Sequence, residues 1–173
     1  MQTPVHALTF VRHQLAFFFS LFLLSGCAIQ LVPDYDQALL GGLNAANTEA
    51  LTLFAQVEDG STAEEFGNYA RDYAVLIGKF GALRQRAQSR YVPPLASRLA
   101  EKKIIRDFCA SETNPNGCLN ASPESIGEIL SNLRTMRNLH RDRGLTSGAV
   151  VAFRNRYDIQ IDQALTVENA LKR

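Results

Sequence analysis

The chain has 173 residues, with 18 Lys and Arg against 17 Asp and Glu, and 46% of its residues are hydrophobic. That hydrophobic fraction is too high for a disordered protein, and the length fits one domain or two small ones. A formal net charge of +1 gives no electrostatic support for nucleic-acid binding, so we expect no nucleic-acid partner.

The first segment of the chain has the pattern of an export signal. Arg12 is the only formally charged side chain before Asp34, and an apolar run of ten residues extends from Leu15 to Leu24. At about 1.5 Å per residue this run covers roughly 15 Å, which is half of the hydrocarbon core of a bilayer. The run is therefore too short for a comfortable membrane span and fits the hydrophobic region of a signal peptide.

The end of the apolar run carries the sequence Leu24-Ser25-Gly26-Cys27. This sequence resembles the lipobox of bacterial lipoproteins. The resemblance covers the leader alone, and it implies cleavage before Cys27, a diacylglycerol on the Cys27 thiol and an acyl chain such as palmitate on its new amino group. Because Ala28 rather than Asp follows the cysteine, it also implies a lipid-anchored protein of the outer membrane that faces the periplasm. A buried N-terminal helix with an incidental cysteine is the alternative.

This interpretation divides the chain into a signal peptide (1–26), a lipidated cysteine with a short tether (27–33) and a helical bundle domain (34–173). Cleavage would leave 147 residues with 17 basic and 17 acidic side chains, so the mature protein is formally neutral. A chain of this length buries roughly two-thirds of its surface in one core. The six residues from Ala28 to Pro33 reach at most about 20 Å, which would keep the domain close to the membrane.

Apolar residues at helical spacing predict an all-α fold, an antiparallel bundle of four to five helices. The first helix begins near Asp34 or Asp36 and ends at Asp59-Gly60. The second follows a capping box formed by Thr62 and Glu65. The inner faces predicted for these two helices are Leu39, Leu43, Ala46, Ala50, Leu53 and Val57, and then Phe66, Tyr69, Tyr73, Leu76, Phe80, Leu83 and Ala87.

Three further helices are predicted in the second half of the chain. One begins at Pro93-Pro94, with Leu95, Leu99, Ile105 and Cys109 on one face. The next begins at Ser122-Pro123, with Ser122 as N-cap, and ends near Gly144. The last begins near Thr146. The inner faces of these last two are Ile126, Ile129, Leu130, Leu133, Met136 and His140, and then Val150, Phe153, Tyr157, Ile161, Ala164 and Leu171. No segment alternates for long with a period of two, so little or no sheet is expected.

Cys109 and Cys118 are the two cysteines that remain when Cys27 carries lipid. A bacterial envelope is oxidising, so we expect a disulfide between them. It would close a ring of ten residues and contribute roughly 2–3 kcal/mol of stability. A zinc site or a redox pair has less support, because eight residues separate the two cysteines and His140 is the only histidine after the leader.

The sequence contains no pattern that points to catalysis. There is no Glu-x-x-His pair for a di-iron site, no C-x-x-C-H for haem, no phosphate-binding glycine loop and no Gly-x-Ser-x-Gly elbow. His140 is expected to be a structural or helix-capping histidine. We therefore expect no catalytic residue, no metal, no cofactor and a non-enzymatic protein. An enzyme that uses carboxylates such as Glu64, Glu65 and Asp72 is the weaker alternative.

Arg134, Arg137 and Arg141 are spaced three and four residues apart and so lie along one side of a helix. One interpretation is that they form ion pairs across the helix seam with carboxylates such as Asp158 and Asp162. The other is that they contact the acidic segment of a partner or anionic lipid headgroups.

Arg84, Arg86 and Arg90 lie near the end of the second predicted helix and could extend that basic surface. The helix dipole also favours cations at this position.

The leading functional hypothesis is an envelope lipoprotein that acts as a docking or structural protein, with another envelope protein as its partner. Small lipidated helical domains with a disulfide resemble the pilotins, which escort secretins to the outer membrane, at the level of fold class alone. The alternative is a small-ligand-binding domain with Arg137 as a polar contact between helices.

Overall fold

The computed structural model describes residues 30–102 and 119–172. The predicted lipidation site Cys27 and both cysteines of the predicted disulfide, Cys109 and Cys118, lie outside these ranges. The fold below is that of the compact unit Leu31–Arg173.

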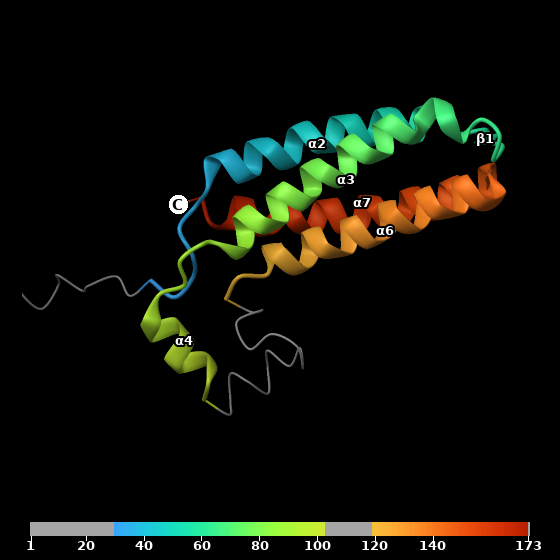
Figure 1. Cartoon of the computed structure of the whole chain (residues 1–173). Coiled ribbons are helices and arrows are strands. Elements are labelled where there is room, and N and C mark those ends of the chain that lie inside the picture. Colours follow the sequence, from blue (N-terminus) through green and yellow to red (C-terminus); the bar gives the residue numbers. More distant parts are fainter. Residues whose placement is uncertain (1–29, 103–118, 173) are drawn as a thin grey trace, which may run out of the picture. The chain divides into compact units, whose positions relative to one another are not determined.

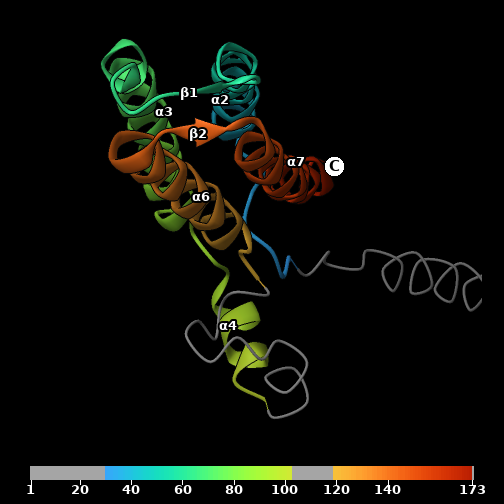
Figure 2. The ribbon, with the colours of Figure 1, turned by 90° about the vertical axis from the view of Figure 1, so that its right-hand side faces the viewer.

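Four long helices form an antiparallel bundle, which confirms the all-α prediction (Figure 1). They are α2 (Gln37–Gln56), α3 (Phe66–Gln88), α6 (Ser122–Arg143) and α7 (Ser147–Ala170). Each helix packs against the next in the order α2, α3, α6, α7, and α7 packs back against α2, so that the ring closes (Figure 2). A short helix, α4 (Pro94–Ala100), lies in the connection between α3 and α6.

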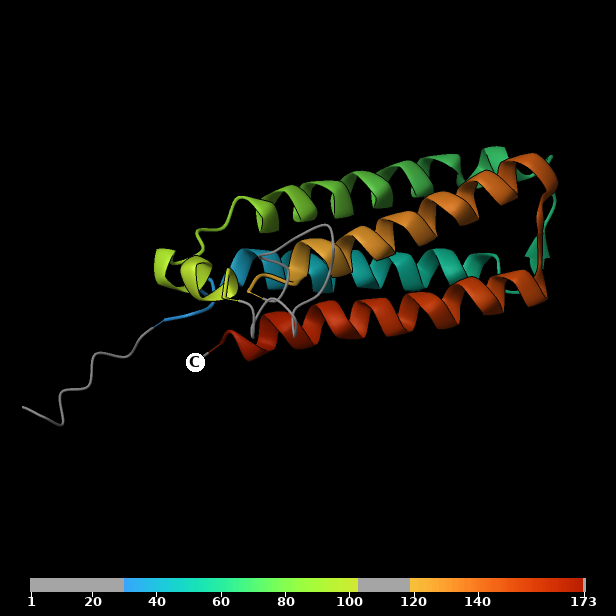
Figure 3. The same cartoon turned by 90° about the horizontal axis from the view of Figure 1, so that it is seen from below.

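Two short strands join the loops at one end of the bundle. β1 (Gly60–Ser61) and β2 (Leu145–Thr146) pair antiparallel, with Gly60 opposite Thr146 and Ser61 opposite Leu145. Figure 3 shows that α4, the start of α2 and the end of α7 lie at the other end of the bundle. We call these the strand end and the tether end.

Glycine is required where the two strands meet. Gly60 and Gly144 both have positive φ angles, of 98° and 78°. A Cβ atom at Gly60 would lie 2.7 Å from the Leu145 carbonyl oxygen, and one at Gly144 would lie 2.8 Å from the Ser61 carbonyl oxygen. These two glycines therefore permit both the turn conformation and the close approach of the two loops.

Two of the long helices, α2 and α7, begin where the sequence predicts, and each has a capping side chain at its start. Asp36 caps α2 by accepting hydrogen bonds of 3.0 Å from the backbone N–H groups of Ala38 and Leu39. Thr146 caps α7 by accepting from the N–H of Ala149 at 3.2 Å.

The capping box before α3 forms one of its two expected bonds. The Glu65 carboxylate accepts from the Thr62 N–H at 2.8 Å and from the Ser61 hydroxyl at 3.0 Å. These bonds, that of the backbone N–H first, lower the pKa of Glu65.

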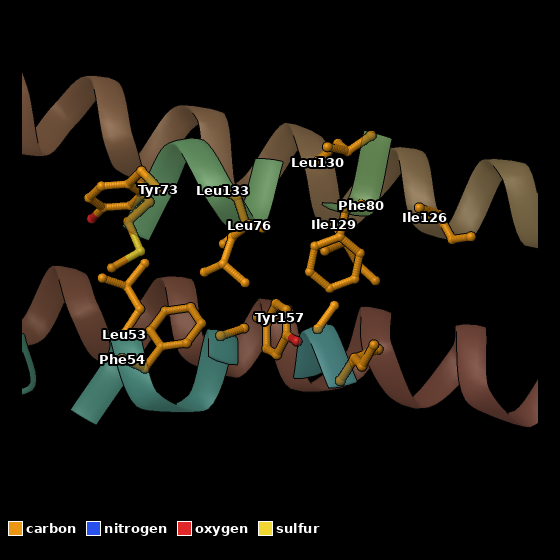
Figure 4. Packing of buried hydrophobic residues seen from close by; sticks show 14 of the residues in the cluster. Leu53, Phe54, Tyr73, Leu76, Phe80, Ile126, Ile129, Leu130, Leu133 and Tyr157 are labelled. Carbon is orange, nitrogen blue, oxygen red and sulfur yellow. The ribbon is translucent and has the colours of Figure 1, made fainter. Parts of the chain in front are cut away.

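The core lies between the four helices and consists of the predicted apolar faces. Figure 4 shows Phe54 of α2, Leu76 and Phe80 of α3, and Tyr157 of α7 pointing toward one another. The ring centroid of Tyr157 lies 5.3 Å from that of Phe54 and 6.4 Å from that of Phe80. The Tyr157 hydroxyl donates to Asn47 Oδ1 at 3.0 Å, which ties α7 to α2.

Two details of the predicted helices are wrong. Ser122 is the first residue of α6 rather than its N-cap, because its hydroxyl binds Glu168 of α7 instead of a backbone N–H of its own helix. In α4 the buried residues are Ala96 and Ala100, whereas Leu95 is exposed. Leu99, also predicted on that face, is half-buried, and the remaining two residues, Ile105 and Cys109, lie outside the described ranges.

Candidate functional site

The basic strip of Arg134, Arg137 and Arg141 follows the outer side of α6. Arg134 and Arg141 are exposed and Arg137 is half-buried. The Arg137 guanidinium donates to Asn138 Oδ1 from Nε at 3.2 Å and from Nη2 at 3.0 Å, in an exposed position. Its polar group is thus engaged at the helix surface rather than between helices.

Arg141 is paired with its chain neighbour. Its Nε donates to Asp142 Oδ1 at 2.8 Å, and both side chains are exposed. This hydrogen bond raises the pKa of Arg141 and lowers that of Asp142.

The expected ion pairs across the seam between α6 and α7 are not the ones that form among the described residues. On α7, Arg154 binds Asp158, one turn further along the same helix, at 2.8 and 2.9 Å. The Arg154 guanidinium also lies 5.6 Å from the centre of the Phe54 ring. Both pairs, Arg154 with Asp158 and Arg141 with Asp142, join residues of the same helix, and exposed pairs of this kind contribute little to stability.

The arginines near the end of α3 tie the tether end together and do not extend the basic strip. Arg86 forms a two-pronged ion pair with Asp36, with Nε 2.6 Å from Oδ2 and Nη2 3.0 Å from Oδ1. Arg84 Nε donates to the Pro123 carbonyl at 3.3 Å. α3 is thereby joined to the start of α2 and to the start of α6. The hydrogen bond from Arg86 lowers the pKa of Asp36.

The third of these arginines, Arg90, lies in a buried polar cluster with Asn120, Ser122 and Glu168, which we call the Arg90 cluster. The side chain of Glu168 is fully buried and that of Arg90 is 8% exposed. Arg90 Nη1 lies 3.0 Å from Glu168 Oε2, and Nη2 lies 2.9 Å from Oε1. Both guanidinium prongs therefore bind the same carboxylate.

Neighbouring side chains bind most of the remaining polar groups of the cluster, whereas the buried Arg90 Nε has no hydrogen-bond partner within the described structure. Arg90 Nη2 also donates to Asn120 Oδ1 at 2.7 Å and to the Ser122 hydroxyl at 2.8 Å, and that hydroxyl donates to Glu168 Oε1. Asn120 Nδ2 donates to the carbonyl of Ala87 at 2.8 Å. The cluster thus joins the end of α3, the start of α6 and the last turns of α7.

The bonding of Glu168 shows what the cluster does. Its two carboxylate oxygens accept from two guanidinium nitrogens and one hydroxyl, so the charge is held by fixed donors and is removed from water. Such a carboxylate is suited to fixing three elements rather than to moving protons.

The sequence prediction missed the role of Glu168, although a signal was present. Glu168 follows Ala164 by four residues and Ile161 by seven, so it lies on the apolar face of the last helix. A charged residue in that position requires a buried partner of opposite charge.

His140 is buried in an aromatic core rather than placed as a helix cap. It is fully buried, and its ring lies 5.4, 5.3 and 5.8 Å from the rings of Phe66, Tyr69 and Tyr73. Its Nδ1 lies 3.2 Å from the Tyr73 hydroxyl, and its Nε2 has no hydrogen-bond partner within the described structure. Burial lowers the pKa of His140, while the Thr62 backbone and the Glu65 charge act in the opposite direction.

Surface hollows lie along the helix seams. One of about 360 Å³ runs between α2 and α3 and is crossed by the ion pair of Glu49 with Lys79. Another, of about 300 Å³, runs between α6 and α7 and is lined by the amides of Asn132 and Gln160. In residues 30–102 and 119–172, no group of three or more His, Cys, Asp or Glu side chains is placed to hold a metal ion.

The Arg90 cluster predicts a large effect of removing its acid. Glu168→Ala should lower the free energy of unfolding by about 3–5 kcal/mol, because it leaves the Arg90 charge buried without a partner. The matched control Asp158→Ala removes an exposed carboxylate of the same helix and should cost less than about 0.5 kcal/mol. Urea titration followed by circular dichroism measures both. Equal losses in the free energy of unfolding for the two variants would show that the buried ion pair contributes no more to stability than the exposed one.

The buried histidine predicts a loss of stability in mild acid. The unfolded chain binds a proton on His140 below its ordinary pKa of 6.5, whereas the folded chain, with a lowered pKa, resists it. Stability should therefore be level above that pH and fall below it, by at most about 1.4 kcal/mol per pH unit.

His140→Phe should remove this slope between about pH 7.5 and 5.5, a range above the titration of the carboxylates. Urea midpoints across this range measure the slope. If the variant and the natural chain had the same slope, His140 would not be its source.

None of the helices in the described ranges is long and apolar enough to cross a membrane. No family model matches the sequence, and neither the curated proteins nor the solved structures yield a match. Function is therefore inferred from the residues themselves.

Proposed function

We propose that this protein is an envelope lipoprotein, anchored by lipid at Cys27 to the outer membrane and facing the periplasm, with a non-enzymatic docking or structural role. The observation that carries the proposal is the apolar run from Leu15 to Leu24, closed by Ser25, Gly26 and Cys27. Several acyl chains on one residue would hold the protein stably, since a single chain binds only marginally.

The architecture of the tether end supports an anchored role. The tether leads directly into Asp36, which caps α2 and is bound by Arg86 of α3. The Arg90 cluster fixes α3, α6 and α7 at the same end. Through these contacts, a pulling force on the tether would act on all four helices rather than on α2 alone.

The basic strip on α6 is the surface that we propose for the partner. Arg134, Arg137 and Arg141 lie on one outer side of the helix, and Arg134 has no ion-pair partner in the part of the chain that the structure describes. An acidic segment of another envelope protein would complement this strip and be steered toward it. The surface bonding of Arg137 does not favour the alternative of a ligand site between the helices.

The anchor can be tested with two cysteine variants. Cys27→Ser should release the protein from membranes into the soluble periplasmic fraction, because serine provides no thiol for the diacylglycerol. Cys109→Ser removes a cysteine of the predicted disulfide and should leave the protein in the membrane fraction. Fractionation and immunoblotting measure both. Retention of the Cys27 variant in the membrane would overturn the anchor.

The docking surface can be tested by charge reversal. The double variant Arg134→Glu, Arg141→Glu should reduce chemical cross-linking to a membrane-resident partner at least several-fold. Arg71→Glu, at an exposed arginine of α3, is the matched control and should leave cross-linking unchanged. Each exposed substitution should change stability by no more than about 0.5 kcal/mol. Undiminished cross-linking of the double variant would exclude the strip as the docking surface.

A further inference from the structure

We infer that the tether end of the bundle rests on the lipid surface, with Leu31, Tyr91 and Leu95 as its contacts with the membrane. This inference builds on the proposed lipid anchor. It adds an orientation for the protein and names the side chains that set that orientation.

Three of the six large hydrophobic side chains that are exposed in the described ranges belong to this end. Leu31 is 39% exposed, Tyr91 is 68% exposed and Leu95 is 45% exposed. They come from two segments that the ion pair of Arg86 with Asp36 brings together. Leu31 precedes Asp36 by five residues and Tyr91 follows Arg86 by five, so each lies within about 17 Å of that pair.

The length of the tether identifies a lipid surface as the occupant. Leu31 follows Cys27 by four residues, which span at most about 14 Å when fully extended. An acylated Cys27 lies at the membrane interface, so Leu31 must lie at or just above the headgroups. Any face of the protein beside Leu31 is then close to lipid for geometrical reasons.

The side chains themselves suit that environment. Tyrosine has an apolar ring and a polar hydroxyl, and it is enriched where membrane meets water. Arg98 follows Leu95 by three residues and is exposed, and Lys102 is exposed just beyond the end of α4. An exposed leucine suits acyl chains, and the long side chains of Arg98 and Lys102, with the exposed Glu101 between them in sequence, can reach headgroup phosphates.

This contact of the tether end with the lipid surface, which we call the seating, sets the orientation of the bundle relative to the membrane. α3 has 23 residues and extends about 34 Å, so the strand end stands roughly that far from the membrane-facing end. Arg141, in the last turn of α6, lies near the strand end. Anchoring would therefore use the tether end, while the basic strip occupies the half of α6 that is nearer the strand end.

The absence of tryptophan from the chain permits a direct test. Tyr91→Trp places a single fluorophore at the tether end. Val151→Trp places one at a side chain that is 56% exposed and lies in the first turns of α7, next to the strand end. Each full-length protein is reconstituted into phosphatidylethanolamine and phosphatidylglycerol vesicles that contain brominated lipids. We expect emission from Trp introduced at position 91 to shift to the blue and to be quenched several-fold more strongly than that at position 151.

A second preparation separates this inference from the anchor. There the same variants are held on nickel-chelating lipids through an N-terminal histidine tag, so that contact does not depend on acylation. Stronger quenching at position 91 than at position 151 on nickel lipids, together with an unmodified Cys27 in the natural protein extracted from membranes, would support the seating and reject the anchor. An acylated Cys27 with equal quenching at both positions would keep the anchor and reject the seating.

Other occupants of this end have distinct signatures. Emission from position 91 that is blue-shifted without vesicles and is not quenched by brominated lipid would show that protein covers the site. If that shift depended on protein concentration, the cover would be a second copy, and if it did not, the cover would be another part of the same chain. Either result would overturn the seating.

Discussion

The arrangement of the helices at the tether end depends on the buried carboxylate of Glu168. Removing such a charge from water is costly unless a partner of opposite charge and further donors surround it, and Arg90, Ser122 and Asn120 form that surrounding cluster. Because these four residues come from three separate segments, satisfying one charge fixes the end of α3, the start of α6 and the last turns of α7. The bond from Arg86 to Asp36 adds α2 to the same end.

That constraint connects the fold to the proposed role. A bundle held only by its apolar core resists unfolding, but a pull on its first helix acts on the contacts of that helix alone. Here the cap of α2 is also an ion-pair partner of α3, and α3 is joined to the two remaining helices within four residues, between Arg86 and Arg90. The tether end is thus joined by polar contacts among all four long helices, while the strand end is closed by two short strands and the glycine turns at Gly60 and Gly144.

The apolar faces of all four long helices could be predicted because a period near 3.6 residues is visible in a single sequence. Tyr73, Leu76 and Phe80 lie where that period places them. The hydrogen bonds and ion pairs between helices could not be predicted in this way. Arg90 and Glu168 are 78 residues apart, and no local spacing reveals that they meet. Ser122 shows the same limit. Its local sequence favours an N-cap role, but its hydroxyl donates to the buried Glu168 carboxylate of another helix, which no local pattern reveals.

The proposed anchor depends on a covalent change at one thiol, and the orientation of the bundle on the membrane depends on that anchor. The most direct measurement is the intact mass of the natural protein extracted from membranes, with sequencing of its first residues. We predict a chain that begins at Cys27 and carries the added mass of a diacylglycerol and an acyl chain. A chain that still contains residues 1–26 and carries no lipid mass would contradict it.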